Sequence, residues 1–192
     1  MINAIQIFVS VIRFFPLWVM LVVKQRLLND EEAKKFNEDI RYFGKRFFPL
    51  LAQRPFYVMM LYRRLGKWSK LLRPWCGSYM LFVRDKDVMS LDGGVYLDHP
   101  HGTRVGAVSI GRDLQLKHNV TIGNSDGQFP TIGDNVFCGC GSCILGGIHV
   151  GNNVVIGANA VVVRDVPDDA VVVGNPARIV RLRGERVDIA LT

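Results

Sequence analysis

An apolar residue recurs at every sixth position through the second half of the sequence. The positions that start each repeat are Leu91, Leu97, Ile110, Leu116, Ile122, Ile132, Cys138, Ile144, Val150, Ile156 and Val162. The step from Leu97 to Ile110 is one residue longer than two repeats. The step from Ile122 to Ile132 is one repeat with four extra residues. A six-residue period is typical of a β-helix, in which each unit supplies a short strand and a turn.

The repeat also predicts which residues lie above one another. Three units close one triangular coil, so every third start lies on the same face: Leu97, Leu116, Cys138 and Ile156. Side chains alternate along a strand, so the residues two places further on form one predicted column: His99, His118, Cys140 and Ala158. This column has two histidines at one end and small residues beyond them, which predicts a narrow groove.

The first half of the sequence differs in period and in charge. Residues 1–84 contain 15 Lys and Arg and 5 Asp and Glu, a net charge of +10, whereas residues 85–192 contain 9 and 12, a net charge of −3. We therefore divide the chain into an α-helical region over 1–84, a β-helix over 85–177 and a tail over 178–192. The basic half predicts an anionic partner, and since no nucleic-acid-binding motif accompanies the charge, we favour a membrane surface over nucleic acid.

Residues 1–23 are strongly apolar and long enough to span a bilayer. Their polar residues recur at helical spacing and form one stripe: Asn3, Gln6, Ser10 and Arg13. This pattern favours a helix that lies in the membrane interface, with a spanning helix and a helix buried within the protein as the alternatives. The protein is then predicted to be cytoplasmic and associated with the inner face of the cell membrane.

Two further helices are predicted in the basic half. The first covers 30–46, with Asn29 or Asp30 as its N-cap and an apolar side that contains Phe36 and Ile40. The second covers 55–74 and has an apolar side and a basic side, the latter formed by Arg63, Arg64, Lys67 and Lys70. A basic helix edged with aromatic residues suits anionic lipid headgroups, and a solvated face is the alternative.

The repeat, the Leu97-Asp98-His99 segment and the closing Gly174-Asn175-Pro176-Ala177 segment resemble the hexapeptide-repeat acyltransferases. Within that family the sequence is similar to the serine acetyltransferase branch, including its relatives that O-acetylate bacterial surface glycans. The resemblance covers about residues 54–183. It implies a left-handed parallel β-helix, a homotrimer with the active site between subunits, and acetyl-CoA as co-substrate.

The resemblance places the catalytic general base at His99. Histidine suits this role, since its neutral imidazole can take the proton of a hydroxyl that attacks a thioester. The resemblance also gives Asp98 to acceptor binding, and we expect His101 and His118 beside it. A carboxylate that orients the histidine is expected upstream, at Asp85, Asp87 or Asp92.

The insertion Asn124–Thr131 is expected to contact the acceptor or CoA. In serine acetyltransferases the corresponding loop carries an Arg-His pair that helps to hold the amino acid, whereas this loop has no cation. A sugar hydroxyl therefore fits better than free serine, with Phe129 stacking on the ring, although Arg104 is a nearby cation that keeps serine open. Predicted CoA contacts are Gly123, Asn124, Cys140 and Ala158.

The cysteines at 138, 140 and 143 have a spacing that would allow a metal, but the repeat directs Cys138 inward and Cys140 outward. We therefore predict reduced thiols and no metal. The predicted function is acetyl-CoA-dependent O-acetylation of a bacterial surface polysaccharide or of a lipid-linked glycan precursor. The alternatives are a serine O-acetyltransferase of cysteine biosynthesis, and a non-catalytic or zinc-binding β-helix at the membrane.

Overall fold

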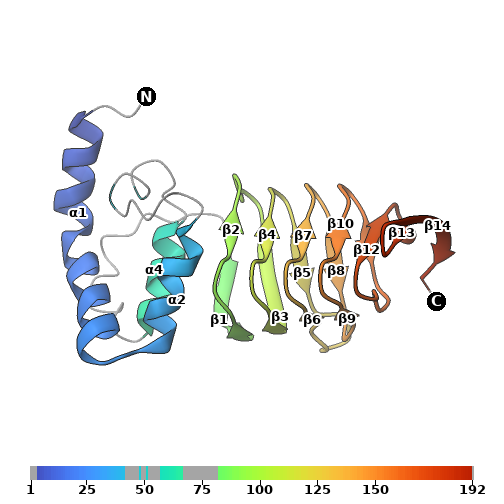
Figure 1. Ribbon diagram of the computed structural model, residues 1–192, viewed down its shortest axis with the longest axis horizontal. Helices are drawn as coiled ribbons and strands as arrows, with labels where there is room; N and C mark the ends of the chain where they lie inside the picture. Colours follow the sequence, from blue (N-terminus) through green and yellow to red (C-terminus); the bar gives the residue numbers. More distant parts are fainter. Residues whose placement is uncertain (1–3, 42–47, 49–50, 52–56, 67–81, 192) are drawn as a thin grey trace. The chain divides into compact units, whose positions relative to one another are not determined.

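The computed structural model describes residues 4–41, 48, 51, 57–66 and 82–191, and for residues 6, 59 and 82–89 it describes the backbone alone. The chain divides into two compact units, Met1–Tyr79 and Met80–Thr192. The first unit contains the helices and the second contains a β-helix (Figure 1). Each unit is described separately below.

Short parallel strands form the second unit. They are β1 (Phe82–Leu91), β2 (Tyr96–Leu97), β3 (Arg104–Ile110), β4 (Gln115–Leu116), β5 (Thr121–Gly123), β6 (Thr131–Ile132), β7 (Phe137–Cys138), β8 (Cys143–Leu145), β9 (His149–Val150), β10 (Val155–Ile156), β11 (Val161–Val162) and β12 (Ala170–Val173). One face of the helix is β2-β4-β7-β10-β12. The second is formed by the starts of β1 and β3 with β5, β8 and β11, and the third by the ends of β1 and β3 with β6 and β9.

The predicted six-residue period is confirmed. All the apolar positions that start a repeat are buried, with side chains no more than 5% exposed. The first face has the predicted register, since Leu97 pairs with Leu116, Leu116 with Cys138, and Cys138 with Ile156. The core of this unit is therefore a stack of aliphatic side chains inside the coils.

The first coil departs from the period at the corner between β2 and β3. Leu97 pairs with Leu116, nineteen residues on, whereas Val105 pairs with Ile122, seventeen residues on. The corner at 98–103 therefore holds two more residues than the corner below it. The next side is one residue short, since Val105 and Ile110 are five residues apart and both are buried. The inward position missing from the predicted series is thus Val105.

Left-handed turns close the corners of the coils. Asparagine and aspartate supply most of the residues with positive φ in this unit: Asp113, Asn119, Asp126, Asn135, Asn153, Asn159 and Asp169. These residues tolerate this backbone conformation better than other non-glycine residues. Gly102 also has a positive φ, of 69°. Glycine is required there for a steric reason as well, because a Cβ would lie 2.2 Å from Asn119 Oδ1.

The C-terminal end of the β-helix is closed by antiparallel strands. β13 (Arg178–Leu182) pairs with β12, and β14 (Glu185–Ala190) pairs with β13. Arg178 donates from Nε to Asp188 Oδ1 at 2.7 Å, across β13 and β14. The last residues therefore cover the open end of the stack (Figure 1).

The N-terminal unit contains α1 (Ala4–Val22), a π-helical turn η1 (Val23–Leu27), α2 (Glu31–Asp39) and α4 (Tyr57–Leu65). Asp30 is the N-cap of α2, since its Oδ1 accepts a hydrogen bond from the Ala33 N–H at 2.8 Å. α2 ends at Asp39, earlier than predicted, and the rest of the 30–46 prediction lies largely outside the described residues. α4 likewise confirms a helix for the first part of the predicted 55–74 segment, and Lys67 and Lys70 lie outside the description.

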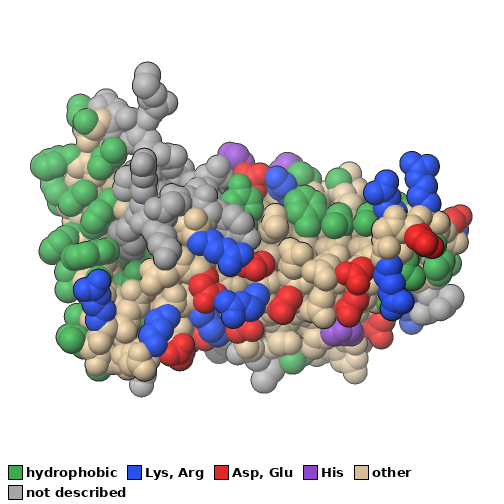
Figure 2. Space-filling view, in the orientation of Figure 1, with side chains coloured by type: hydrophobic (Ala, Val, Ile, Leu, Met, Phe, Trp, Pro, Cys, Tyr) green, Lys and Arg blue, Asp and Glu red, His purple; other side chains and the backbone are tan. Residues whose placement is uncertain are grey.

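The structure corrects the polarity of two predicted helix faces. Ser10, from the polar stripe of α1, is buried and donates to the Phe48 carbonyl at 2.8 Å. The exposed side of α1 is apolar, and Figure 2 shows hydrophobic side chains along it. Arg64, predicted on a basic lipid-facing side, is fully buried because α2 provides two carboxylates for its guanidinium, Asp39 and Glu32.

Candidate active site

The lengthened corner at 98–103 carries the predicted catalytic histidine. His99 has a left-handed backbone, with φ at 52°. The chain turns tightly after it, since the His101 N–H donates to the His99 carbonyl at 2.7 Å and the Thr103 N–H donates to the Pro100 carbonyl at 3.2 Å. The extra residues therefore bring His99 out of the regular coil rather than into its wall.

The His99 imidazole contacts the carboxylate of the residue before it. Nδ1 lies 2.8 Å from Asp98 Oδ1, and the His99 side chain is 70% exposed. A hydrogen bond at Nδ1 fixes the tautomer whose free lone pair is at Nε2. The assignment of Asp98 to the acceptor alone was therefore incomplete, since this carboxylate orients the histidine.

The upstream aspartates are described only in part. Asp92 is half-buried next to β1, and the side chains of Asp85 and Asp87 lie outside the described part of β1. Among the contacts of the described side chains, it is the carboxylate of the adjacent Asp98 that meets His99. An orienting role for an upstream aspartate stays a prediction.

Lys117 is a site residue that sequence reasoning missed. Its Nζ forms an ion pair with Asp98 Oδ2, and the hydrogen bond to Asp98 raises the pKa of Lys117. The signal was present in the repeat, since Asp98 and Lys117 directly follow the paired residues Leu97 and Leu116. Opposite charges at equivalent positions of adjacent strands are expected to meet.

A cavity of about 330 Å³ opens on the second face of the β-helix. It brings together four of the residues singled out from the sequence: Arg104, Gly123, Asn124 and Phe129. The inserted loop borders it through a tight turn, with Asp126 and Gly127 both at positive φ and reciprocal backbone hydrogen bonds between Ser125 and Gln128. Arg104 immediately follows the corner of His99, so corner and cavity are joined by consecutive residues.

The predicted column of side chains requires one correction. The Asn119 N–H donates to His101, the Gly141 N–H to His118, and the Asn159 N–H to Cys140. These equivalent bonds align the column as His101, His118, Cys140 and Ala158. His101 takes the place predicted for His99, because the corner contains two extra residues. None of these four residues lines the cavity described above.

Cys138 and Cys140 lie as the repeat predicts. Cys138 is buried in the core, and burial raises the pKa of its thiol to about 12. Cys140 is half-buried on the outside of the same coil. Within the described residues, no three His, Cys, Asp or Glu side chains are grouped so that they could hold a metal ion.

The coils and their repeat define the class of protein. Residues 129–164 match the bacterial transferase hexapeptide family, which is described by six repeats. The chain is accordingly a hexapeptide-repeat β-helix protein, and the relatives that it resembles over most of its length are serine acetyltransferases.

Three relatives illustrate this similarity. The chain is 43% identical to serine acetyltransferase from Synechococcus elongatus over 103 residues, which cover 51% of this chain and 42% of that protein. It is 43% identical over 174 residues to serine acetyltransferase from Buchnera aphidicola subsp. Acyrthosiphon pisum, covering 80% and 64%. The structure of Neisseria gonorrhoeae serine acetyltransferase in complex with serine aligns with a TM-score of 0.63 at 26% identity, covering 85% and 73%. The chain thus spans less than two thirds of the length of these two curated relatives.

Proposed function

We propose that the chain is an acetyl-CoA-dependent O-acetyltransferase and that serine is its acceptor. The observation that carries the proposal is the Asp98–His99 pair, an exposed imidazole with Nδ1 held by a carboxylate. The similarity of the chain to a serine acetyltransferase over four fifths of its length supports the choice of reaction and acceptor. This acceptor replaces the surface glycan preferred from the sequence, which becomes the second candidate.

The proposed step follows from the free lone pair at His99 Nε2. This nitrogen takes the hydroxyl proton as the acceptor oxygen attacks the thioester carbonyl. The tetrahedral intermediate then collapses, the carbon–sulfur bond breaks, and the imidazolium returns the proton to the leaving CoA thiolate. Asp98 stabilises the imidazolium during the step, as a carboxylate does when it contacts Nδ1–H.

Arg104 supports serine as the acceptor. It lines the cavity, it is exposed, and no acidic side chain of the described residues is paired with it. A guanidinium of this kind binds a carboxylate through charge-assisted hydrogen bonds. Arg104 therefore supplies the cation that the loop at 124–131 lacks, and Gly123, Asn124 and Phe129 border the same space for acceptor or CoA.

We expect CoA release from acetyl-CoA to depend on L-serine and to fall sharply with L-serine methyl ester, which lacks the carboxylate. Arg104→Gln is expected to raise the KM for serine about 10- to 100-fold, the range that the loss of a charged hydrogen bond allows. Arg164→Gln, an exposed arginine on the last coil, is the matched control. Turnover with a lipid-linked glycan extract and none with serine would instead establish the glycan acceptor. Inactivity with both acceptors would contradict the transferase proposal.

The second candidate is favoured by the exposed face of α1. Its large exposed apolar side chains are Ile5, Phe8, Val9, Ile12, Phe15, Trp18 and Val19. The segment Ile7–Leu27 is long and apolar enough to cross a membrane, judged by length and composition. The opposite side of α1 packs within its unit through Phe14, Leu17 and Leu21, so we propose that the helix lies along a membrane surface rather than across it.

Phe8→Asp combined with Ile12→Asp is expected to lower binding to anionic lipid vesicles at least tenfold. Each side chain contributes about 1.5–3 kcal/mol when it leaves water, and both are exposed, so the core of the unit is unchanged. Deletion of 1–23 would also remove the buried Leu17 and Leu21. Val163→Asp, at an exposed valine of the β-helix, is the control for charge alone. Unchanged vesicle sedimentation would contradict membrane binding, and loss of an oligomer would show that α1 packs against a second copy.

A further inference from the structure

The carboxylate of Asp98 is shared between two side chains. Its Oδ1 lies 2.8 Å from His99 Nδ1, and its Oδ2 forms the ion pair with Lys117 Nζ. The Asp98 side chain is 21% exposed and that of Lys117 is 32% exposed, whereas His99 is 70% exposed. The most accessible member of this chain of contacts is thus the imidazole, and the two residues behind it are largely shielded from solvent.

The backbone positions Asp98 and Lys117 opposite each other. The two residues follow the paired Leu97 and Leu116, and the Asp98 N–H donates to the Leu116 carbonyl at 2.9 Å. The Lys117 backbone is fixed in turn, because its carbonyl accepts from Thr103 Oγ1 at 2.9 Å. Its ammonium also lies 5.9 Å from the centre of the Phe137 ring, on the next coil, which adds a cation–π contact.

We propose that Lys117 is a positioning residue for His99 and acts on it through Asp98. With Oδ2 held by the ammonium, the carboxylate stays turned so that Oδ1 faces the imidazole. Without this ion pair the carboxylate loses the contact that holds Oδ2, and it orients the ring less often. The proposal rests on the acetyl-transfer function proposed above, and it assigns a role to a residue outside the inserted loop and the cavity.

The ammonium of Lys117 has titratable neighbours besides Asp98. Tyr96 and Cys140 interact electrostatically with Lys117. The other titratable groups at this corner and the one below it are His101 and His118, both exposed.

Lys117→Met tests the role in two independent ways. In the full-length protein, the ¹⁵N chemical shifts of the neutral His99 ring are expected to change from those of the single Nδ1–H tautomer toward those of a mixture of tautomers, because the contact at Nδ1 is lost part of the time. The resonances are assigned by their absence in His99→Asn. The kcat/KM is expected to fall about tenfold, since the ring is oriented less often. Lys117→Arg is expected to restore both quantities, and Arg164→Met, at an exposed cation of the last coil, to change neither.

The tautomer measurement separates this proposal from the proposed function. A loss of the single tautomer in Lys117→Met that Lys117→Arg reverses supports the positioning role, even in a protein that acetylates neither serine nor a glycan. An unchanged tautomer overturns it, including the case in which activity falls, since that loss would reflect a structural role of the lysine. A changed tautomer with undiminished kcat/KM would also overturn it, because the contact held by Lys117 would then not matter for the reaction.

Discussion

Replacing His99 by asparagine is expected to lower the kcat/KM for acetyl transfer by about 10²–10⁴-fold, the range that a general base contributes. Asparagine suits this test because His99 has a φ of 52°, and asparagine occupies the same left-handed conformation at 119, 135, 153 and 159. The fold of the corner is therefore preserved while the base is removed. The measurement is thiol release from acetyl-CoA at saturating acceptor, with circular dichroism to confirm the β-helix.

His149→Asn is the matched control for loss of an imidazole. His149 lies on β9, on another face of the β-helix, and its Nδ1 is 2.9 Å from Thr131 Oγ1. We expect this variant to keep activity within about twofold of the wild type. A loss smaller than about tenfold in His99→Asn would contradict the role of His99 as the base.

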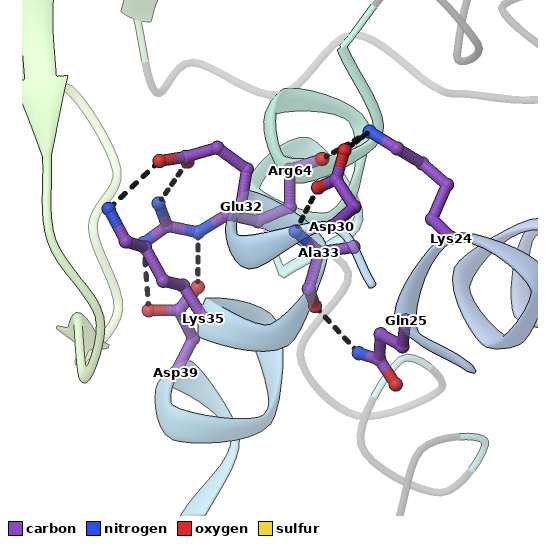
Figure 3. A network of polar contacts seen from close by, with 8 residues as sticks. All are labelled: Lys24, Gln25, Asp30, Glu32, Ala33, Lys35, Asp39 and Arg64. Atoms are coloured by element: carbon purple, nitrogen blue, oxygen red, sulfur yellow. Dashed lines mark hydrogen bonds and ion pairs between the residues drawn. The ribbon is translucent and has the colours of Figure 1, made fainter. Parts of the chain in front are cut away.

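Replacing Asp39 by alanine is expected to destabilise the N-terminal unit by about 3–5 kcal/mol. Figure 3 shows the network that this change disrupts, in which Arg64 donates from Nε to Asp39 Oδ2 at 3.0 Å and from a terminal nitrogen to Glu32 at 3.0 Å. The side chains of Arg64 and Asp39 are both fully buried. Without Asp39 the guanidinium remains buried and loses the carboxylate that is buried with it, so its charge is less well compensated.

Tryptophan fluorescence during urea unfolding measures this change selectively. The three tryptophans of the chain, Trp18, Trp68 and Trp75, all belong to the unit Met1–Tyr79. Glu31→Ala is the control, since Glu31 forms an exposed pair with Lys34 that is worth less than about 1 kcal/mol. An Asp39→Ala variant as stable as this control would show that the buried pair does not support the unit.

The β-helix was predictable because a six-residue period repeats over many units. Every inward position has the same buried environment and therefore favours an apolar residue. The period can be recognised even where one position deviates, because the neighbouring repeats still show it. The register from Leu97 to Ile156 and the burial of Cys138 follow directly from counting. The same counting fixes that His149 belongs to another face.

The candidate site was harder to predict because it lies where the repeat is interrupted. The spacing between Leu97 and Ile110 shows one extra residue, whereas the structure divides this into two added at the corner and one removed from the following side. The sequence spacing shows only the net change of one residue, not the two changes that produce it. The exchange of His99 for His101 in the column, and the contact from Asp98, both follow from this division.

The N-terminal unit was less predictable for a different physical reason. A basic side chain on an amphipathic helix is ordinarily solvated, and burial of Arg64 depends on carboxylates from α2, 25 and 32 positions earlier in the sequence. The sequence pattern within the 55–74 segment contains no information about partners so far away in the chain. Helix existence and the Asp30 cap were local properties, and these were predicted correctly.

The lengthened corner at 98–103 also bears on how such a scaffold diversifies. Backbone hydrogen bonds to the coil below are in regular register on both sides of the corner, at Asp98 and at Arg104. Residues between these points can be gained or lost while the buried stack keeps its shape. A solenoid of this kind separates the part of the chain that determines stability from the part that determines chemistry. New acceptor specificities can then arise by editing one corner, without the cost of repacking a core.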